Sequence, residues 1–302
     1  MRDRRWRRPA LAATLMALTG CTGAGLLNGL DRLTPGGDGA TRVVRGAAYG
    51  SQQRQALDVW VPTARRYRGQ KLPVLVFFYG GGWDSGSRGD YGFAGAAYAG
   101  QGFVTVVPDY RLVPAVRFPA FVEDGALALR WARENVARYG GDPERITLAG
   151  HSAGGYIAAM LALDRRWLDG AGVDPRTVKA AALLAAPLDF APFTESRGRN
   201  AFAHWSDVRA TQPISFARAD APPIFLAHGT ADRVVFPRNS QRLAARLQSL
   251  GAPATLRLYP GANHTDLVVS LARPFRRKTP ALRDTAAFLR SATAPPTSGS
   301  SE

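Results

Sequence analysis

Short apolar runs rich in β-branched and aromatic residues alternate along the chain with segments of helical periodicity. The runs predict strands at 57–61, 74–79, 103–107, 146–149, 178–186, 224–227 and 255–259, with a hairpin-like stretch from Arg42 before the first of them. Apolar positions at helical spacing predict helices at 120–139, 153–163, 237–250 and 280–289. Strands that alternate with helices indicate an α/β fold in which helices cover both faces of a mostly parallel central sheet.

One domain over residues 42–290 accounts for this pattern without an internal repeat or a second linker. Residues 22–41 are rich in Gly, Thr and Asp, which favours a tether. The tail 291–302 is small, polar and proline-containing, and we expect it to be disordered. Because the segment before the domain is short and glycine-rich, we expect no large cap domain.

The first 20 residues have the pattern of a secretory signal, with five Arg before an apolar run of 11 residues. That run is too short to cross a bilayer, which takes roughly 20 apolar residues. The sequence Leu18-Thr19-Gly20-Cys21 resembles the bacterial lipobox, in which the cysteine is lipidated and becomes the new N-terminus. The resemblance implies a signal peptide at 1–20, a lipidated tether at 21–41 and lipidation of Cys21.

The implied address is the cell envelope, as a membrane-anchored lipoprotein on the periplasmic or outer-membrane side. Residue Thr22 is not the Asp that commonly retains such proteins in the inner membrane. The alternative is an ordinary signal peptide followed by a buried cysteine.

The charge balance is strongly basic, with 39 Lys and Arg against 23 Asp and Glu and a formal net charge of +16. Such an excess often marks a nucleic-acid or anionic-membrane partner. Removal of residues 1–20 leaves +12, which is spread along the chain and is densest at 273–278. No basic stretch is interleaved with aromatic residues in the manner of a surface that binds single-stranded nucleic acid. We therefore expect an anionic bilayer, and not nucleic acid, beside the protein. The single cysteine excludes a disulfide framework and a Cys-rich zinc site.

A candidate nucleophile lies between the predicted strand 146–149 and the predicted helix 153–163. The segment Gly150-His151-Ser152-Ala153-Gly154-Gly155 has the G-x-S-x-G pattern of a nucleophile elbow. The serine of such an elbow occupies a strained turn, so the flanking glycines remove side chains that would clash. The helix behind it directs backbone N–H groups at the reacting oxygen. The pattern predicts that Ser152 is the nucleophile.

A serine nucleophile needs a base, and the four histidines of the chain allow elimination. His151 adjoins the serine on the elbow, where we expect it to point away. His204 lies in an irregular segment, and His228 ends a strand before a turn that it would shape. His264 follows the last strand at the carboxyl end of the sheet and is therefore the expected base.

The acid that orients the base is expected after the strand 224–227, where Asp232 lies. The order Ser152, Asp232, His264 is the one that α/β-hydrolases require. Asp189, which follows the preceding strand, is the competing candidate. Asp266 is two residues beyond the histidine and reads as a loop carboxylate.

Consecutive glycines end the strand 74–79, in the sequence Tyr79-Gly80-Gly81-Gly82-Trp83. Glycines let backbone N–H groups approach a developing oxyanion closely, so this segment is a candidate oxyanion loop. A plain glycine-rich turn is the alternative interpretation.

Together these motifs resemble the α/β-hydrolase fold over 42–290, and within it the hormone-sensitive-lipase-like and feruloyl-esterase-like carboxylesterases. The resemblance rests on segments 79–83, 108–114, 150–155, 229–234 and 261–264. It implies that the oxyanion donors are the N–H groups of Gly81, Gly82 and Ala153. It also implies structural supports beneath the site at Asp109, Tyr110 and Arg111. The departure is Tyr79, because the family usually has His there to brace the loop.

The implied reaction is hydrolysis of small-to-medium carboxylic esters through an acyl-enzyme on Ser152, without a metal or organic cofactor. Residues 187–222 are expected to line the acyl pocket with aromatic side chains, unless these only pack under a long loop. The aromatics concerned are Phe190, Phe193, Phe202, His204, Trp205 and Phe216. An arylformamidase-like amide hydrolase and a non-catalytic envelope lipoprotein on a hydrolase scaffold are the alternatives. The sequence leaves the oligomeric state open.

Overall fold

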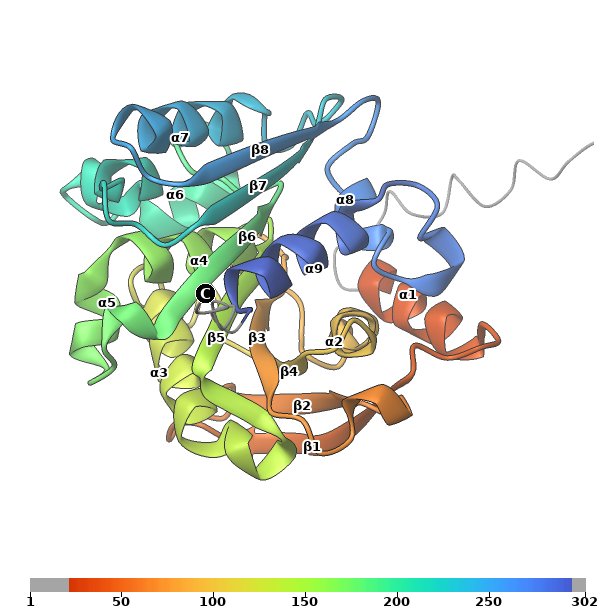
Figure 1. Cartoon of the computed structure of the whole chain (residues 1–302). Helices are drawn as coiled ribbons and strands as arrows, with labels where there is room; N and C mark the ends of the chain where they lie inside the picture. Colours follow the sequence, from red (N-terminus) through yellow and green to blue (C-terminus); the bar gives the residue numbers. More distant parts are fainter. Residues whose placement is uncertain (1–21, 295–302) are drawn as a thin grey trace, which may run out of the picture.

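The computed structural model describes residues 22–294, which build an eight-stranded sheet (Figure 1). Its strands, in spatial order, are β1 (Ala40–Ala48), β2 (Ala56–Pro62), β4 (Val104–Pro108), β3 (Leu72–Phe78), β5 (Gly141–His151), β6 (Val178–Leu184), β7 (Ile224–Gly229) and β8 (Ala254–Tyr259). Pairing is antiparallel between β1 and β2 and between β2 and β4, and parallel from β4 to β8. The predicted mostly parallel sheet is confirmed.

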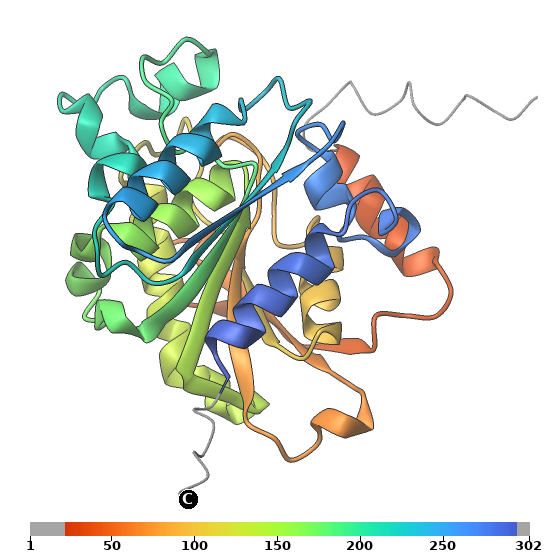
Figure 2. The same cartoon turned by 45° about the horizontal axis from the view of Figure 1, so that its top comes forward.

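Helices cover both faces of this sheet, as Figure 2 shows. On one face lie α3 (Ala120–Asn135), α4 (Ala153–Leu163) and α7 (Arg238–Ser249), and on the other lie α2 (Gly92–Gly100) and α9 (Ala281–Ala292). Shorter helices are α5 (Arg165–Gly170), α6 (Ser196–Phe202) and α8 (Asp266–Val269). The longest connection between described strands, residues 185–223, contains only α6 and two short 3₁₀ turns, so no large cap domain covers the sheet.

The central strands read as continuous apolar runs because both of their faces are buried. In β3, residues 74–78 are fully buried, and Val76 pairs with Val106 of β4 on one side and Leu148 of β5 on the other. The outermost strands β1 and β8 alternate between more and less exposed positions instead. This arrangement places the carboxyl ends of β3, β5, β7 and β8 at one edge of the sheet.

The tether predicted over 21–41 is wrong for most of its described residues, which form the helix α1 (Thr22–Leu33). Leu27 is buried in the core, and the helix packs against α2. The carboxylate of Asp31 accepts a hydrogen bond of 2.6 Å from the backbone N–H of Arg273. Glycine-rich composition suggested a flexible segment, but tertiary contacts with a distant part of the chain stabilise the helix. The folded domain therefore begins before residue 42.

Helix α2 was not predicted either, because its sequence GFAGAAYAG is built from small residues without amphipathic spacing. The small residues let the helix approach the sheet closely. A Cβ at Gly95 would lie 2.5 Å from the Trp60 ring of β2. The close approach of the helix to the sheet, and not helix propensity, therefore explains the small residues of α2.

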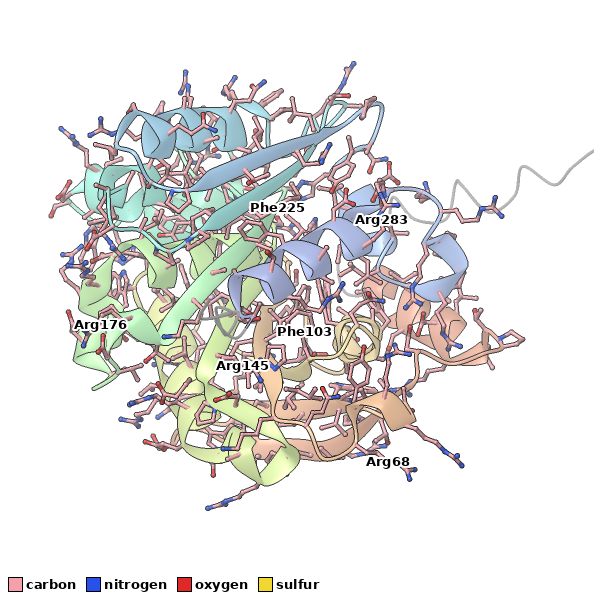
Figure 3. All side chains as sticks on the ribbon, in the orientation of Figure 1. Arg68, Phe103, Arg145, Arg176, Phe225 and Arg283 are labelled. Atoms are coloured by element: carbon pink, nitrogen blue, oxygen red, sulfur yellow. The ribbon has the colours of Figure 1, made fainter. Side chains whose placement is uncertain are left out.

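Both chain ends bear on the remaining domain predictions. Helix α9 continues to Ala292, so the tail predicted from 291 is helical at its start. The predicted signal peptide 1–20, Cys21 and residues 295–302 lie outside the described residues. Between residues 22 and 294, no helix combines the length and the apolar character that a membrane span requires. Arginine side chains project from several sides of the domain, including Arg68, Arg176 and Arg283 (Figure 3).

Candidate active site

The backbone at Ser152 has the strained conformation of a nucleophile elbow. Its φ is 52° and its ψ is −122°, between the last residue of β5 and the first residue of α4. A Cβ at Gly150 would lie 2.3 Å from the Gly154 carbonyl oxygen, and a Cβ at Gly154 would lie 2.1 Å from the Phe78 carbonyl oxygen. The two glycines are therefore required for the chain to turn here and present the serine.

The structure brings the three predicted triad residues together at the carboxyl edge of the sheet. His264 Nε2 is 3.0 Å from Ser152 Oγ, and His264 Nδ1 is 2.8 Å from Asp232 Oδ2. An ionised carboxylate only accepts hydrogen bonds, so Nδ1–H donates to Asp232 and the lone pair of Nε2 faces the serine hydroxyl. This tautomer is the one that a general base for Ser152 needs.

Asp232 is held as a buried anion. Its side chain lies in the loop after β7, and the residue is only 2% exposed. Oδ1 accepts hydrogen bonds of 2.9 Å from the N–H groups of Val234 and Val235. Burial opposes ionisation, but hydrogen bonds from His228, His264 and the backbone outweigh it and hold the pKa of Asp232 below its usual value. The competing candidate Asp189 instead pairs with Arg242, at 2.8 Å.

The remaining histidines make backbone contacts, and two of them bear on the site, since His228 Nε2 also lies 3.3 Å from Asp232 Oδ2. His228 is fully buried and donates from Nε2 to the Val235 carbonyl at 2.7 Å, so it shapes the turn as predicted. His204 Nε2 is 2.8 Å from the Phe118 carbonyl. His151 does not simply point away, because its Nε2 lies 2.9 Å from the carbonyl oxygen of His264. It thereby joins the elbow to the loop that carries the base, a contact that no local sequence signal indicates.

Burial and the neighbouring His264 lower the pKa of His151 to about 3, so the buried ring is neutral in the folded protein. The unfolded chain, in which a histidine has a pKa near 6.5, binds one more proton between about pH 3 and 6.5. Stability should therefore fall by about 1 kcal/mol per pH unit, from this residue alone, as the pH is lowered through that window. Urea titrations of the wild type and His151→Gln at several pH values measure it. The variant, which can still donate to the His264 carbonyl, should have the shallower pH dependence, and parallel curves would contradict the assignment.

The glycine loop lies directly against the elbow. A Cβ at Gly80 would be 3.2 Å from the Ser152 Cβ. Gly81 and Gly82 have φ values of 139° and 60°, which side chains disfavour, and a Cβ at Gly81 would lie 2.2 Å from the Ser85 carbonyl. Among residues 22–294, no protein acceptor is found for the N–H groups of Gly81, Gly82 and Ala153. These groups can therefore receive an oxyanion.

Tyr79, at the position where the family usually has His, braces this loop from below. Its hydroxyl donates to Asp109 Oδ1 at 2.9 Å and accepts from Arg54 Nη2 at 2.7 Å. The ring stacks between Tyr91 and Tyr110, with centroid distances of 5.2 and 4.8 Å. Burial raises the pKa of Tyr79 well above its usual value, so the hydroxyl keeps the proton that it donates.

Besides Asp109, the resemblance implies Tyr110 and Arg111 as supports, and both of them also lie beneath the loop. Tyr110 donates from its hydroxyl to the Tyr79 carbonyl at 3.0 Å. Arg111 forms an ion pair of 2.8 Å with the fully buried Asp124 of α3. The Tyr110 contact fixes the segment after β4 against the residue that leads into the glycine loop, and the Arg111 contact fixes the same segment against α3.

We expect Tyr79→Phe to lower kcat with little change in KM, because the loop keeps its shape for binding but loses the bond that fixes its donors. The buried carboxylate of Asp109 and the partly exposed guanidinium of Arg54 lose a partner, which should cost about 1–3 kcal/mol of unfolding free energy. Steady-state kinetics and urea titration measure both effects.

Tyr98→Phe is the matched control for this variant. Tyr98 is also fully buried and its hydroxyl is 2.9 Å from Thr285 Oγ1, but this contact joins α2 to α9 and does not involve the glycine loop. It should lose stability and keep kcat. An equal loss of kcat in both variants would show that Tyr79 acts through general stability alone.

Three of the six aromatics predicted for the acyl pocket gather around Trp83, which follows the glycine loop. The Trp83 ring lies 4.8 Å from Phe202 and 6.1 Å from Phe190 between centroids. Phe193 stacks on Phe202 at 5.5 Å. Phe202 is fully buried, whereas Phe190 and Phe193 are half-buried. Of these three rings, only Phe190 and Phe193 therefore keep a surface that is open to contact.

The other three aromatics pack elsewhere. Trp205 meets Phe118 edge to face at 5.0 Å, with the exposed His204 beside it. Phe216 lies under the guanidinium of Arg166, 5.1 Å from its ring centre. Their contacts are those of ordinary packing beneath a long loop. Fewer aromatic side chains are therefore candidates for the pocket lining than the sequence indicated.

Arg197 of α6 is a neighbour of the site that sequence reasoning missed. Its Nε is 3.0 Å from Asp84 Oδ2, and a Cβ at Gly82 would lie 2.5 Å from its Cδ. The pair joins α6 to the glycine loop across more than 100 residues of sequence, and nothing local to either residue predicts it.

Comparison with known proteins places this arrangement in a family. The BD-FAE family model matches residues 57–247. A probable isoprenylcysteine alpha-carbonyl methylesterase of Oryza sativa subsp. japonica is 34% identical over 250 residues, which cover 76% of this chain and 58% of that protein. The esterase LipC of Mycobacterium tuberculosis is 32% identical over 250 residues, covering 73% of this chain and 59% of that protein.

Solved structures agree in fold. The apo form of Thermogutta terrifontis esterase 2 has a TM-score of 0.66 at 26% identity and covers 86% of this chain and 98% of that chain. The chain thus spans nearly the whole of that structure, but less than two thirds of the two curated relatives. The family match over most of the domain, together with the order of strands, elbow and loops, shows that the chain belongs to the BD-FAE family of the α/β-hydrolase fold.

Proposed function

We propose that the protein is a carboxylesterase that cleaves small-to-medium carboxylic esters through an acyl-enzyme on Ser152. The observation that carries the proposal is the continuous relay from Asp232 through His264 to Ser152, with contacts of 2.8 and 3.0 Å. The names of the relatives, which are esterases, support the same class of reaction.

The contacts assign a role to each group. His264 Nε2 removes the hydroxyl proton as Ser152 Oγ attacks the ester carbonyl, and Asp232 stabilises the imidazolium that forms. The N–H groups of Gly81, Gly82 and Ala153 would stabilise the tetrahedral oxyanion. The imidazolium then protonates the leaving alcohol, and a water activated by His264 releases the acid and restores the serine. Each donor of an oxyanion hole is typically worth about 100- to 1,000-fold in turnover.

The expected substrate has a modest acyl group and a small alcohol. The half-buried Phe190 and Phe193 favour an apolar or aromatic acyl group next to the loop. The methylesterase name of the rice relative fits a small leaving alcohol.

A panel of p-nitrophenyl esters of rising chain length tests the proposal, with N-formylkynurenine as the amide comparison. We expect turnover of the acetate and butyrate, a decline with longer acyl chains and no turnover of N-formylkynurenine. Preference for the formamide would instead support the arylformamidase alternative. Absence of turnover together with absence of fluorophosphonate labelling would support a non-catalytic scaffold.

We also propose that cleavage after Gly20 leaves Cys21 as a lipidated N-terminus that anchors the protein in the cell envelope. The support is the lipobox-like sequence and the position of the only cysteine in the chain. Fractionation of cells that express the wild type or Cys21→Ser tests it. Most of the variant should move from the membrane to the soluble fraction. A wild type that carries no lipid, or a variant that fractionates like the wild type, would contradict the anchor.

A further inference from the structure

Helix α1 exposes leucine side chains on its outer surface. Leu26, Leu30 and Leu33 are 51%, 38% and 82% exposed, and their spacing of four and three residues places them on one side of the helix. The opposite side holds Leu27 and Asp31, which are buried against the domain. Between residues 23 and 33 the only other exposed residue is Arg32. The free surface of α1 is thus apolar and basic, without a carboxylate.

The exposed leucines are not a general feature of the surface. Among the residues that the structure describes, only seven large hydrophobic side chains are exposed, and α1 carries three of them. The others are Val43, Val208, Val234 and Phe236. Exposed leucines concentrated on one short helix indicate a surface that contacts something apolar.

The most basic stretch of the sequence packs beside this helix. Figures 1 and 2 show the chain after α8 running next to α1, where Arg273 donates to the Asp31 carboxylate. In 22–38 and 266–278 together there are five basic and three acidic residues. The three acids are paired, since Asp31 and Asp38 are covered by Arg273 and Arg276, and Asp266 binds Lys278 at 2.8 Å.

We propose that α1 and segment 273–278 form a membrane-contacting surface, in which the leucines enter an anionic bilayer and Arg32, Arg277 and Lys278 contact its headgroups. An amphipathic helix with apolar residues on one side and basic residues beside them binds in the plane of such an interface. The residue that precedes α1 is Cys21, the proposed lipid attachment point, so an acyl chain there would hold this same surface at the bilayer. One acyl chain gives only marginal binding, and a second contact makes it stable.

The surface also adjoins the site. Asp266, which binds Lys278, accepts a hydrogen bond of 3.0 Å from the N–H of Asn263, the residue before the proposed base. Docking through this surface would therefore hold the loop of His264 near the interface, where esters with apolar acyl groups accumulate.

The test uses residues 21–302 with Cys21→Ser, so that no acyl chain contributes and every described element is retained. Flotation with vesicles of phosphatidylglycerol and phosphatidylcholine in equal parts measures binding, with pure phosphatidylcholine vesicles for comparison. We expect binding to the anionic vesicles that weakens in high salt. Leu26→Ser/Leu30→Ser/Leu33→Ser should weaken it about 10-fold or more, as should Arg32→Gln/Arg277→Gln on the anionic vesicles alone.

Val43→Ser/Val208→Ser is the matched control, because both side chains are similarly exposed but lie on β1 and near α6. It should bind like the parent chain, and circular dichroism melting should show that all variants fold. Equal binding by the leucine variant overturns the proposal. The proposal is also overturned if the parent chain does not bind vesicles but forms a dimer, and the leucine variant is a monomer. Because no ester is involved, these outcomes are independent of whether the esterase proposal holds.

Discussion

Ser152→Ala is expected to reduce kcat for p-nitrophenyl acetate by about a million-fold, to the level set by the remaining oxyanion donors. The reason is that, within residues 22–294, Ser152 Oγ is the only nucleophile placed at hydrogen-bond distance from His264, 3.0 Å from Nε2. Without it neither an acyl-enzyme nor a phosphonyl-enzyme can form. Steady-state hydrolysis and fluorophosphonate labelling of the purified variant measure the effect.

The matched control is Ser270→Ala. Ser270 is fully buried and donates from Oγ to the Leu267 carbonyl at 2.9 Å, so its removal should lower the unfolding midpoint. Hydrolysis and labelling should stay at the wild-type level. Labelling of Ser152→Ala equal to that of the wild type would refute the assignment of the nucleophile, and with it the proposed mechanism.

Asp232→Asn should lower kcat by about 10⁴-fold while leaving KM near its wild-type value. The carboxylate holds the proton on Nδ1 of His264, which leaves Nε2 free to accept the serine proton. An amide in its place can donate to Nδ1, which favours the tautomer with the proton on Nε2 and removes the base. It also cannot stabilise the imidazolium.

The comparison variant is Asp189→Asn, since Asp189 is the other carboxylate that the sequence offered as the acid. Its side chain pairs with Arg242 and is about a quarter exposed. A half-exposed ion pair contributes little, so we expect kcat within about 2-fold of the wild type and a stability change below about 1 kcal/mol. If Asp189→Asn lost most of its kcat while Asp232→Asn kept nearly the wild-type kcat, Asp189 and not Asp232 would be the acid that orients His264.

The sheet could be predicted from the sequence because its central strands are buried on both faces. Segment 74–79 is apolar throughout and segment 103–107 is apolar except for Thr105, and such runs have few alternatives in a chain of this length. The helices α1 and α2 could not be predicted in the same way. Their glycine-rich sequences have poor intrinsic helix propensity. The helices exist because α2 fits against Trp60 and because Asp31 of α1 binds Arg273, contacts that join segments distant along the chain.

The candidate site was predictable to the extent that each residue lies next to a strand end. Ser152, Asp232 and His264 follow β5, β7 and β8, whose carboxyl ends meet at one edge of the sheet, so a local pattern was enough to make each of them a candidate. His151 has no such pattern, because its contact is with the backbone of a residue 113 positions later. Contacts between residues so far apart in the sequence depend on how the loops pack against each other. No periodicity of the sequence indicates that packing.

The sequence by itself determined the order of the strands, the elbow glycines and the chain order of serine, acid and base. Each of these depends on neighbouring residues through burial or backbone sterics, which leave a local pattern. Only the tertiary structure decided which carboxylate meets His264, how Tyr79 replaces a histidine, and that α1 is a helix with an apolar outer side. These depend on side-chain distances between segments far apart in the chain, where a shift of a few ångströms makes or breaks a hydrogen bond.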